Sequence, residues 1–338
     1  MLLHPWLRRQ DEGRALAALE PVAAPLSALV RRWAWPMLRR WGCIGMGPGQ
    51  FDDPSGVAIS SGGDIVVCDA GNNRVQVFRS DGTFVRQWGS DGAAPGQFQY
   101  PASVAVSSAD EVFVADHGNC RIQVFHLDGS FVRSWGSHQG EAPGQFDRPA
   151  GVAVHGDLVL VSDKGNHRIQ CFGLDGTFVR MWGSKGAAPG QFEYPAGLAV
   201  SAAGEVFVCD SHNNRVQVFG LDGTFKRTFG GLSYAPGRFA LPVHVAVTRA
   251  GEVLVSDFAR VQAFLAADGS HIRCLSLGNP LVTTQNEPYC PLALGCNTCL
   301  WLSGVAVTLT GDIVVVSSGS GSGGSAGLRC LFFETAGA

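Results

Sequence analysis

The stretch Asp69-Ala-Gly-Asn-Asn-Arg-Val-Gln-Val-Phe78 decides the fold, because close copies of it recur along the chain. It is followed by Asp81-Gly82 and then by Trp88-Gly89. Its first residue is repeated, at a step of 47 residues each time, by Asp116, Asp163, Asp210 and Asp257. A period of this length is typical of solenoids, propellers and repeat arrays.

One period carries the pattern of four short strands. Residues 56–59 and 65–68 are apolar, as expected for strands that are covered on both faces. Residues 74–78 alternate between apolar and polar, which predicts a half-buried strand, and the more polar residues 83–88 suit an outer edge. Asp81-Gly82 predicts a type I′ hairpin turn between the last two strands. Four strands in a unit of this size make one blade of a β-propeller.

Three short patterns give the repeat a specific resemblance. They are Pro-x-Gly-Val-Ala-Val, Asp-x-x-Asn-x-Arg-Ile/Val-Gln-Val-Phe and Asp-Gly-x-Phe, and together they resemble the NHL repeat over residues 37–338. The pair of residues that opens each blade is found at Val57, Val104, Val152, Leu198, Val245 and Val305. We therefore expect an all-β fold, a six-bladed β-propeller of NHL repeats.

The first and last parts of the chain complement each other. Trp41 lies 47 residues before Trp88, so residues 37–41 have the phase of a fourth strand, whereas the last copy ends after its third strand, Arg329 to Phe333. We expect this N-terminal strand to complete the last blade and close the ring, since closure leaves no free sheet edge. Residues 1–36 are predicted to be an irregular or partly helical extension.

Charge and cysteine content limit the function classes. Residues 1–40 carry a net charge of +4 and the remainder a net charge of −7, so the propeller lacks the positive excess that is usual for nucleic-acid binding. No apolar run has the length of a membrane span. The cysteines Cys68, Cys171 and Cys209 fall in apolar strands and indicate buried thiols, from which we expect a reducing, cytoplasmic compartment. We also expect a monomeric propeller.

The repeated aspartates each precede an arginine by five residues, or by three in the fifth blade. This spacing predicts structural ion pairs that pin a loop, not a metal site. The expected pairs are Asp69 with Arg74, Asp116 with Arg121, Asp163 with Arg168, Asp210 with Arg215, and Asp257 with Arg260.

Metal and enzyme chemistry receive weak support. Cys290, Cys296 and Cys299 could hold a structural zinc, but their spacing fits no standard four-ligand pattern, and free cysteines are the alternative. Some propellers similar to this one are lyases with zinc-binding histidines where the innermost strands start. Of the corresponding positions only His244 is a histidine, and catalytic zinc needs three protein ligands. We expect neither a cofactor nor an enzyme.

The resemblance also covers the C-terminal propeller of tripartite-motif proteins, which implies a substrate- or RNA-recognition role. Nothing in the sequence resembles a RING or a B-box, so ligase activity is not implied. We therefore expect a binding or scaffold module for a protein or peptide partner. The alternatives are an RNA-binding propeller and a metal-dependent, lyase-like enzyme.

The loops that differ between repeats are expected to carry the binding face. The residues before the strand-opening prolines include Tyr100, Arg148 and Tyr194, which are side chains suited to a peptide or an unstacked base. The neighbouring loops add His117, Lys164, His167, Lys185, His212 and Phe258. The alternative is that both tyrosines simply pack beneath the loops. The positive side chains gather towards the third and fourth blades, where we expect an acidic ligand.

Overall fold

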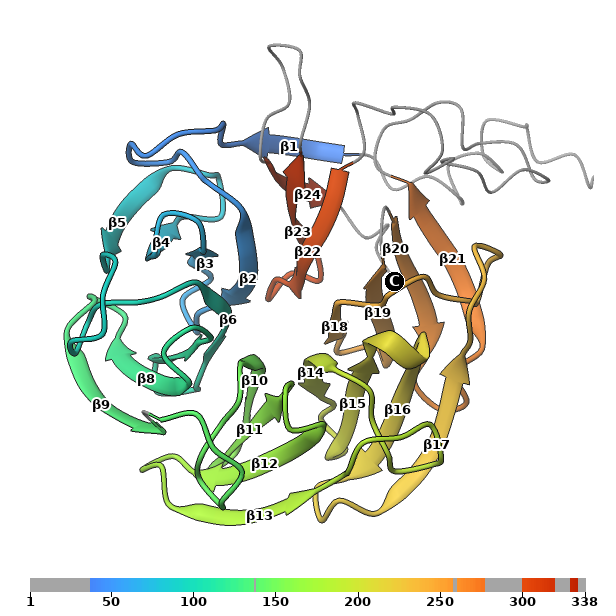
Figure 1. Cartoon of the computed structure of the whole chain (residues 1–338). Helices are drawn as coiled ribbons and strands as arrows, with labels where there is room; N and C mark the ends of the chain where they lie inside the picture. The colour runs from blue at the N-terminus through green and yellow to red at the C-terminus, as the bar shows by residue number, and fades with distance from the viewer. Residues whose placement is uncertain (1–36, 137, 258–259, 277–299, 320–328, 334–338) are drawn as a thin grey trace, which may run out of the picture. The chain divides into compact units, whose positions relative to one another are not determined.

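A computed structural model describes residues 37–136, 138–257, 260–276, 300–319 and 329–333 (Figure 1). The predicted extension over residues 1–36 lies outside the described residues, as do Phe258 and the cysteines Cys290, Cys296 and Cys299. In the described part of the chain, no helix has the length and apolarity needed to cross a membrane.

The described strands form six four-stranded antiparallel sheets, five described in full and the sixth in part. The first consists of β2 (Pro54–Ile59), β3 (Ile65–Asp69), β4 (Arg74–Phe78) and β5 (Phe84–Trp88). The second consists of β6 (Pro101–Val106), β7 (Glu111–Asp116), β8 (Arg121–His126) and β9 (Phe131–Gly136). The third consists of β10 (Pro149–His155), β11 (Leu158–Asp163), β12 (Arg168–Gly173) and β13 (Phe178–Trp182).

The next two sheets repeat this order. The fourth consists of β14 (Pro195–Val200), β15 (Glu205–Asp210), β16 (Arg215–Gly220) and β17 (Phe225–Gly230), with a short 3-10 helix η1 (Ser211–Asn213) in its second loop. The fifth consists of β18 (His244–Val247), β19 (Glu252–Asp257), β20 (Arg260–Leu265) and β21 (His271–Ser276). The first strands of neighbouring sheets contact one another, which gives the all-β propeller seen in Figure 1.

The sixth sheet combines the two ends of the described chain. Its strands are β22 (Leu300–Val307), β23 (Ile313–Gly319), β24 (Arg329–Phe333) and β1 (Met37–Trp41). Strand β1 pairs antiparallel with β24, and Trp41 lies opposite Cys330. The phase of Trp41 in the sequence predicted this pairing. Strand β22 contacts both β18 and β2, so it lies between the fifth and first sheets.

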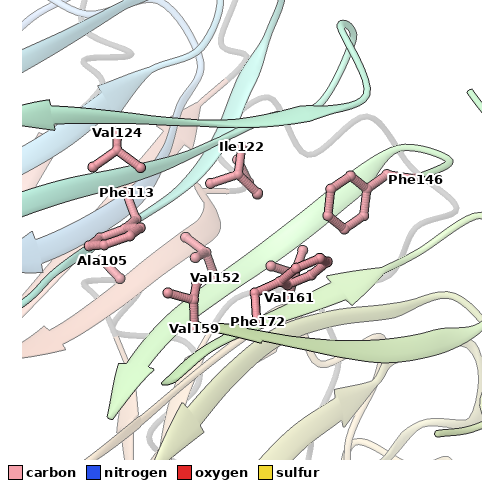
Figure 2. Packing of buried hydrophobic residues seen from close by; sticks show 10 residues of the cluster. Ala105, Phe113, Ile122, Val124, Phe146, Val152, Val159, Val161 and Phe172 are labelled. Atoms are coloured by element: carbon pink, nitrogen blue, oxygen red, sulfur yellow. The ribbon is translucent and has the colours of Figure 1, made fainter. Parts of the chain in front are cut away.

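The core lies between neighbouring sheets, because each sheet presents apolar side chains on both of its faces. Figure 2 shows the cluster between the second and third sheets, where Phe113 and Ile122 face Phe146, Val161 and Phe172. Equivalent clusters join the sixth sheet to the first, the first to the second, the third to the fourth and the fourth to the fifth. The predicted buried thiols Cys68, Cys171 and Cys209 are buried and form no disulfide, and burial raises the pKa of each of them.

Two local predictions need correction. Strand β4 is fully buried, not half-buried, because Gln76 is enclosed and its amide is hydrogen-bonded to Asp69 Oδ2 at 3.0 Å. The turn after it is not type I′, since only Gly82 has a positive φ, of 88°. Gly82 N–H donates to Arg79 O at 2.9 Å, and Arg79 N–H donates to Thr83 O at 2.9 Å. These bonds describe a three-residue loop that ends in a left-handed glycine.

Candidate functional site

The repeated polar residues form a buried network inside each blade. In the first blade, Asp69 Oδ2 accepts a hydrogen bond from Arg74 Nε at 2.7 Å, and Asp69 Oδ1 accepts one from Asp52 N–H at 2.7 Å. Burial raises the pKa of Asp69, while these hydrogen bonds and one from Asn72 act in the opposite direction. The network therefore joins the loop between the second and third strands of the blade (the second-to-third loop) to the loop that leads into the blade.

All five predicted aspartate–arginine pairs are present. The distances from arginine Nε to the carboxylate are 2.8 Å for Asp116 with Arg121, 2.7 Å for Asp163 with Arg168, 2.7 Å for Asp210 with Arg215, and 3.1 Å for Asp257 with Arg260. In the first blade, the remaining guanidinium nitrogens of Arg74 donate to the carbonyl oxygens of Met46, Gly47 and Gln50. Because these charged groups are occupied by one another and by the backbone, they are not available to a ligand.

The loops that connect one blade to the next lie on the same face of the propeller as the second-to-third loops. We call this face the loop face. The residue before each strand-opening proline has a left-handed backbone, with φ between 46° and 55° for Asp53, Tyr100, Arg148, Tyr194 and Leu241. This conformation recurs in every blade from the first to the fifth, so it belongs to the blade and is not by itself a sign of a site.

Side chains of the preceding blade hold these residues in place. The N–H of Tyr100 donates to Asn73 Oδ1 at 2.7 Å, and the N–H of Tyr194 donates to His167 Nδ1 at 3.1 Å. The N–H of Leu241 donates to Asn214 Oδ1 at 2.9 Å. Sequence reasoning missed the two asparagines. The available signal was their position directly before the repeated arginine, where the residue type changes from blade to blade.

Tyr100 lies in the loop that leads from the first blade to the second. Its side chain is 43% exposed, and its hydroxyl donates to the carboxylate of Asp53. Burial of the hydroxyl, together with the hydrogen bond to Asp53, raises the pKa of Tyr100. Its ring centroid lies 6.2 Å from that of His117, whose Nδ1 is 3.2 Å from Pro149 O. Tyr100 is thus both fixed and partly open to solvent.

Tyr194 is the centre of a second group, at the third and fourth blades. Its ring centroid lies 4.7 Å from that of His167 and 4.6 Å from that of His212. The Arg148 guanidinium lies 6.0 Å from the Tyr194 ring centroid, and Arg148 Nε is also 3.2 Å from Asp147 Oδ1. The structure therefore brings four of the predicted residues into one cluster.

A pocket opens beside this cluster. It has a volume of 160 Å³, about that of five water molecules, and its walls combine the starts of innermost strands with second-to-third loops. The lining residues are Lys164, Ala196, Ser211, His212, Leu241, Val243 and Leu302. Sequence analysis did not single out Ala196, Ser211, Val243 or Leu302, which come from the fourth to sixth blades.

Lys164 and His117 are the half-buried basic groups of the loop face. Burial lowers the pKa of Lys164, and the charge of Arg148 lowers it further. Burial also lowers the pKa of His117, and the charges of Lys164 and Arg148 lower it further. Lys185 is exposed. Burial lowers the pKa of His167, and the charge of Lys185 lowers it further.

His244, the histidine at a position that could bind zinc, is hydrogen-bonded to the backbone. His244 Nδ1 accepts a hydrogen bond from Val305 N–H at 3.5 Å, and burial lowers the pKa of His244 to about 4. The neighbouring Gly197 leaves little room, since a Cβ at residue 197 would lie 2.7 Å from His244 Cα. Within the described residues, no group of three or more His, Cys, Asp or Glu side chains is placed to hold a metal ion.

Comparison with known protein families identifies the repeats. The model of the NHL repeat matches residues 51–78, 98–125, 146–172 and 192–219, which are the first four blades. One segment of 45 residues is 51% identical to the B-box type zinc finger protein ncl-1 of Caenorhabditis elegans, and a segment of 45 residues is 44% identical to the protein brain tumor of Drosophila melanogaster. Each match is 13% of this chain but only 5% and 4% of the respective relatives.

Solved structures share the fold. A streptogramin B lyase superposes with a TM-score of 0.58 at 12% identity, over 88% of this chain and 97% of the lyase chain. A gluconolactonase from Xanthomonas campestris superposes with a TM-score of 0.59 at 18% identity, over 85% of this chain and 88% of that chain. At these identities the likeness concerns the fold alone.

Proposed function

Since this chain is a propeller of NHL repeats, we propose that it is a binding module, which holds a protein or peptide partner on its loop face. A propeller fold hosts enzymes, scaffolds and binding domains alike, so the proposal must rest on the site. The site comprises Tyr100, Tyr194 and Arg148, together with the pocket beside Lys164.

One contrast carries the proposal. The polar residues that repeat in every blade, such as Asp163 and Arg168, are buried and satisfied by one another. The residues that change from blade to blade lie on the loop face and remain accessible, among them Tyr100 and Arg148. Buried framework with variable, exposed loops is the arrangement expected of a rigid scaffold that presents a binding surface.

The residue types suit a protein partner. Tyrosine and arginine are enriched among the side chains that dominate binding energy at protein interfaces. Tyr100 and Tyr194 are held by hydrogen bonds and ring contacts, so little conformational entropy is lost when a partner covers them. A fixed aromatic surface next to a cation therefore favours capture of a peptide or a protein loop.

The test is a panel of Tyr100→Ala, Arg148→Glu and Tyr194→Ala, screened with the parent against peptide and RNA libraries. We expect each change to weaken peptide binding by about tenfold or more, as for central interface residues. Arg249→Glu is the matched control, because Arg249 is an exposed arginine in the β18–β19 turn, at the other end of the strands. Thermal melting of every variant checks that the fold is intact.

Three outcomes separate the alternatives. Loss of peptide binding in the panel but not in Arg249→Glu supports the proposal. If the parent binds RNA instead of peptides, and Tyr100→Ala and Tyr194→Ala lose that binding, the nucleic-acid alternative is favoured, because the same aromatic rings would then stack on bases. Unchanged binding of every ligand in all three folded variants would place the site elsewhere.

A further inference from the structure

Lys164 contributes a cation to the wall of the pocket on the loop face. It lies in the loop between β11 and β12 and lines the pocket, but no hydrogen bond or ion pair holds its ammonium group among the described residues. The chain contains only three lysines. Lys226 is paired with Glu205 at 3.0 Å, and Lys185 is exposed to solvent. Lys164 is the half-buried one.

An unpaired, half-buried ammonium group is costly. Removing a cation from water disfavours its charged form unless an anion compensates, which is why burial lowers the pKa of Lys164. The charge of Arg148 repels the Lys164 ammonium group, and His117 adds a further basic group. The carboxylate of Asp147 is engaged by Arg148 Nε at 3.2 Å. Among the residues that the structure describes, none supplies an anion to Lys164.

The rest of the pocket is mostly apolar, with Ser211 and His212 as its other polar side chains. Its other walls include Leu241, Val243 and Leu302, and the hydroxyl of Ser211 donates to Pro242 O at 2.6 Å. An incoming group would therefore meet the Lys164 ammonium group, the His212 imidazole and aliphatic surface. Small size, mostly apolar walls and one lysine fit one acidic side chain with its methylene groups, or the last residue of a chain.

We infer that the pocket beside Lys164 recognises a carboxylate of the partner peptide and sets the specificity of the loop face. This inference rests on the proposed function and adds the chemistry of the ligand. The carboxylate comes from an aspartate or glutamate side chain or from a free C-terminus, and both supply the anion that Lys164 lacks. Aliphatic atoms next to the carboxylate contact Leu241 and Leu302.

A peptide carboxylate fits better than the phosphates of a nucleic acid. Phosphate binding draws on many cations spread along a groove. Here one lysine lies beside an aliphatic wall, and residues 41–338 carry a net charge of −7. Such a surface repels a polyanion at long range but accepts a single carboxylate at the pocket.

The test uses acetylated hexapeptide libraries in which one position at a time is fixed as Glu, Gln or Leu, each made with an amidated or a free C-terminus. The parent is compared with Lys164→Met, which keeps the length of the side chain but removes its charge, and with the matched control Lys226→Met, at a lysine that pairs with Glu205 and does not line the pocket. We expect the parent to prefer Glu over Gln, or the free acid over the amide, by about tenfold. Lys164→Met should lose most of this preference, and Lys226→Met should keep it.

The outcomes distinguish the inference from the proposed function. Peptide binding without an acid preference, or with a preference that survives in Lys164→Met, overturns the inference and leaves the binding role intact. Failure of all peptides to bind overturns both, and tighter binding of an RNA oligonucleotide pool that depends on Lys164 replaces both with nucleic-acid recognition. Thermal melting controls for the fold, and Lys164→Met should melt no lower than the parent because it removes a desolvated charge.

A second readout does not depend on affinity. Because the chain has three lysines, limited acylation followed by peptide mapping reports on each of them separately. The best acidic hexapeptide should slow acylation of Lys164 by about tenfold at near-saturation and leave Lys226 unaffected. Equal rates at Lys164 with and without the bound peptide would contradict the inference.

Discussion

The Cα atom of Gly82 lies against the indole ring of Trp41, although the two residues belong to different sheets. A Cβ at residue 82 would come within 2.9 Å of Trp41 Cδ2. The same contact joins Trp88 to Gly129, Trp135 to Gly176 and Trp182 to Gly223. Strand β1 therefore contacts the first blade just as β5, β9 and β13 each contact the blade that follows.

The contact predicts an unequal effect of two similar substitutions. Gly82→Ala and Gly63→Ala both place an alanine at a positive φ, of 88° and 86°, but nothing lies within 4 Å of a Cβ at residue 63. The backbone strain is therefore shared, and only Gly82→Ala pushes on an indole ring. We expect Gly82→Ala to lower the free energy of unfolding by about 1–3 kcal/mol more than Gly63→Ala. Denaturant titration measures both, and equal losses would show that the Trp41 contact is loose.

Deletion of residues 1–44 should expose a sheet edge. It removes β1, whose pairing covers β24, and an uncovered strand edge pairs with other chains. We expect soluble oligomers and aggregates by size-exclusion chromatography with light scattering. Deletion of residues 1–36 is the control, because it keeps β1 and should leave a monomer. A monomeric 1–44 deletion with unchanged melting temperature would rule out closure by β1.

Asp163→Ala should destabilise the fold without affecting any metal. Asp163 is buried, and its loss leaves Arg168 without the carboxylate that accepts from Nε at 2.7 Å. Breaking a buried pair by removing one partner costs about 3–5 kcal/mol. Asp157→Ala, at an exposed residue of the same blade, should stay within about 0.5 kcal/mol of the parent. The prediction would be contradicted if elemental analysis showed loss of a bound ion while denaturation showed unchanged stability.

His244 should make stability depend on pH in the mildly acidic range. Its pKa in the folded protein is lowered by burial to about 4, against about 6.5 for an unperturbed histidine. Between these values only the unfolded chain binds the proton, so stability is full above about pH 6.5 and falls as the pH drops towards 4. The expected loss is at most about 3 kcal/mol.

The measurement compares parent and His244→Gln by denaturation from pH 7 to 4. The comparison is needed because burial raises the pKa of Asp69, Asp163 and Asp257, and those groups favour the folded state as the pH falls. His244→Gln should show a flatter pH profile than the parent. Parallel profiles would mean that His244 takes up its proton without unfolding.

The sequence alone determined the repeat, the strand order and the pairs that lie within one blade. Asp69 and Arg74 are five residues apart on two paired strands, so the local pattern already places them together. The phase of Trp41 likewise predicted its pairing beside β24, because a strict period assigns every residue to an equivalent position. Burial of Gln76 was missed, because a side-chain amide hydrogen-bonded to Asp69 can be enclosed where the alternating pattern predicts exposure.

Only the tertiary structure decided which residues face each other across blades. A period says which positions are equivalent, but the distance between Tyr194 and Arg148, or between Lys164 and Leu302, depends on how neighbouring sheets pack. The hydroxyl of Tyr100 reaches Asp53 for the same reason, one full repeat away. Packing between sheets is set by the summed side-chain volumes between them, including glycines such as Gly82 that admit a neighbour's ring. The pocket and the place of Lys164 in its wall follow from that packing, and the sequence pattern does not contain them.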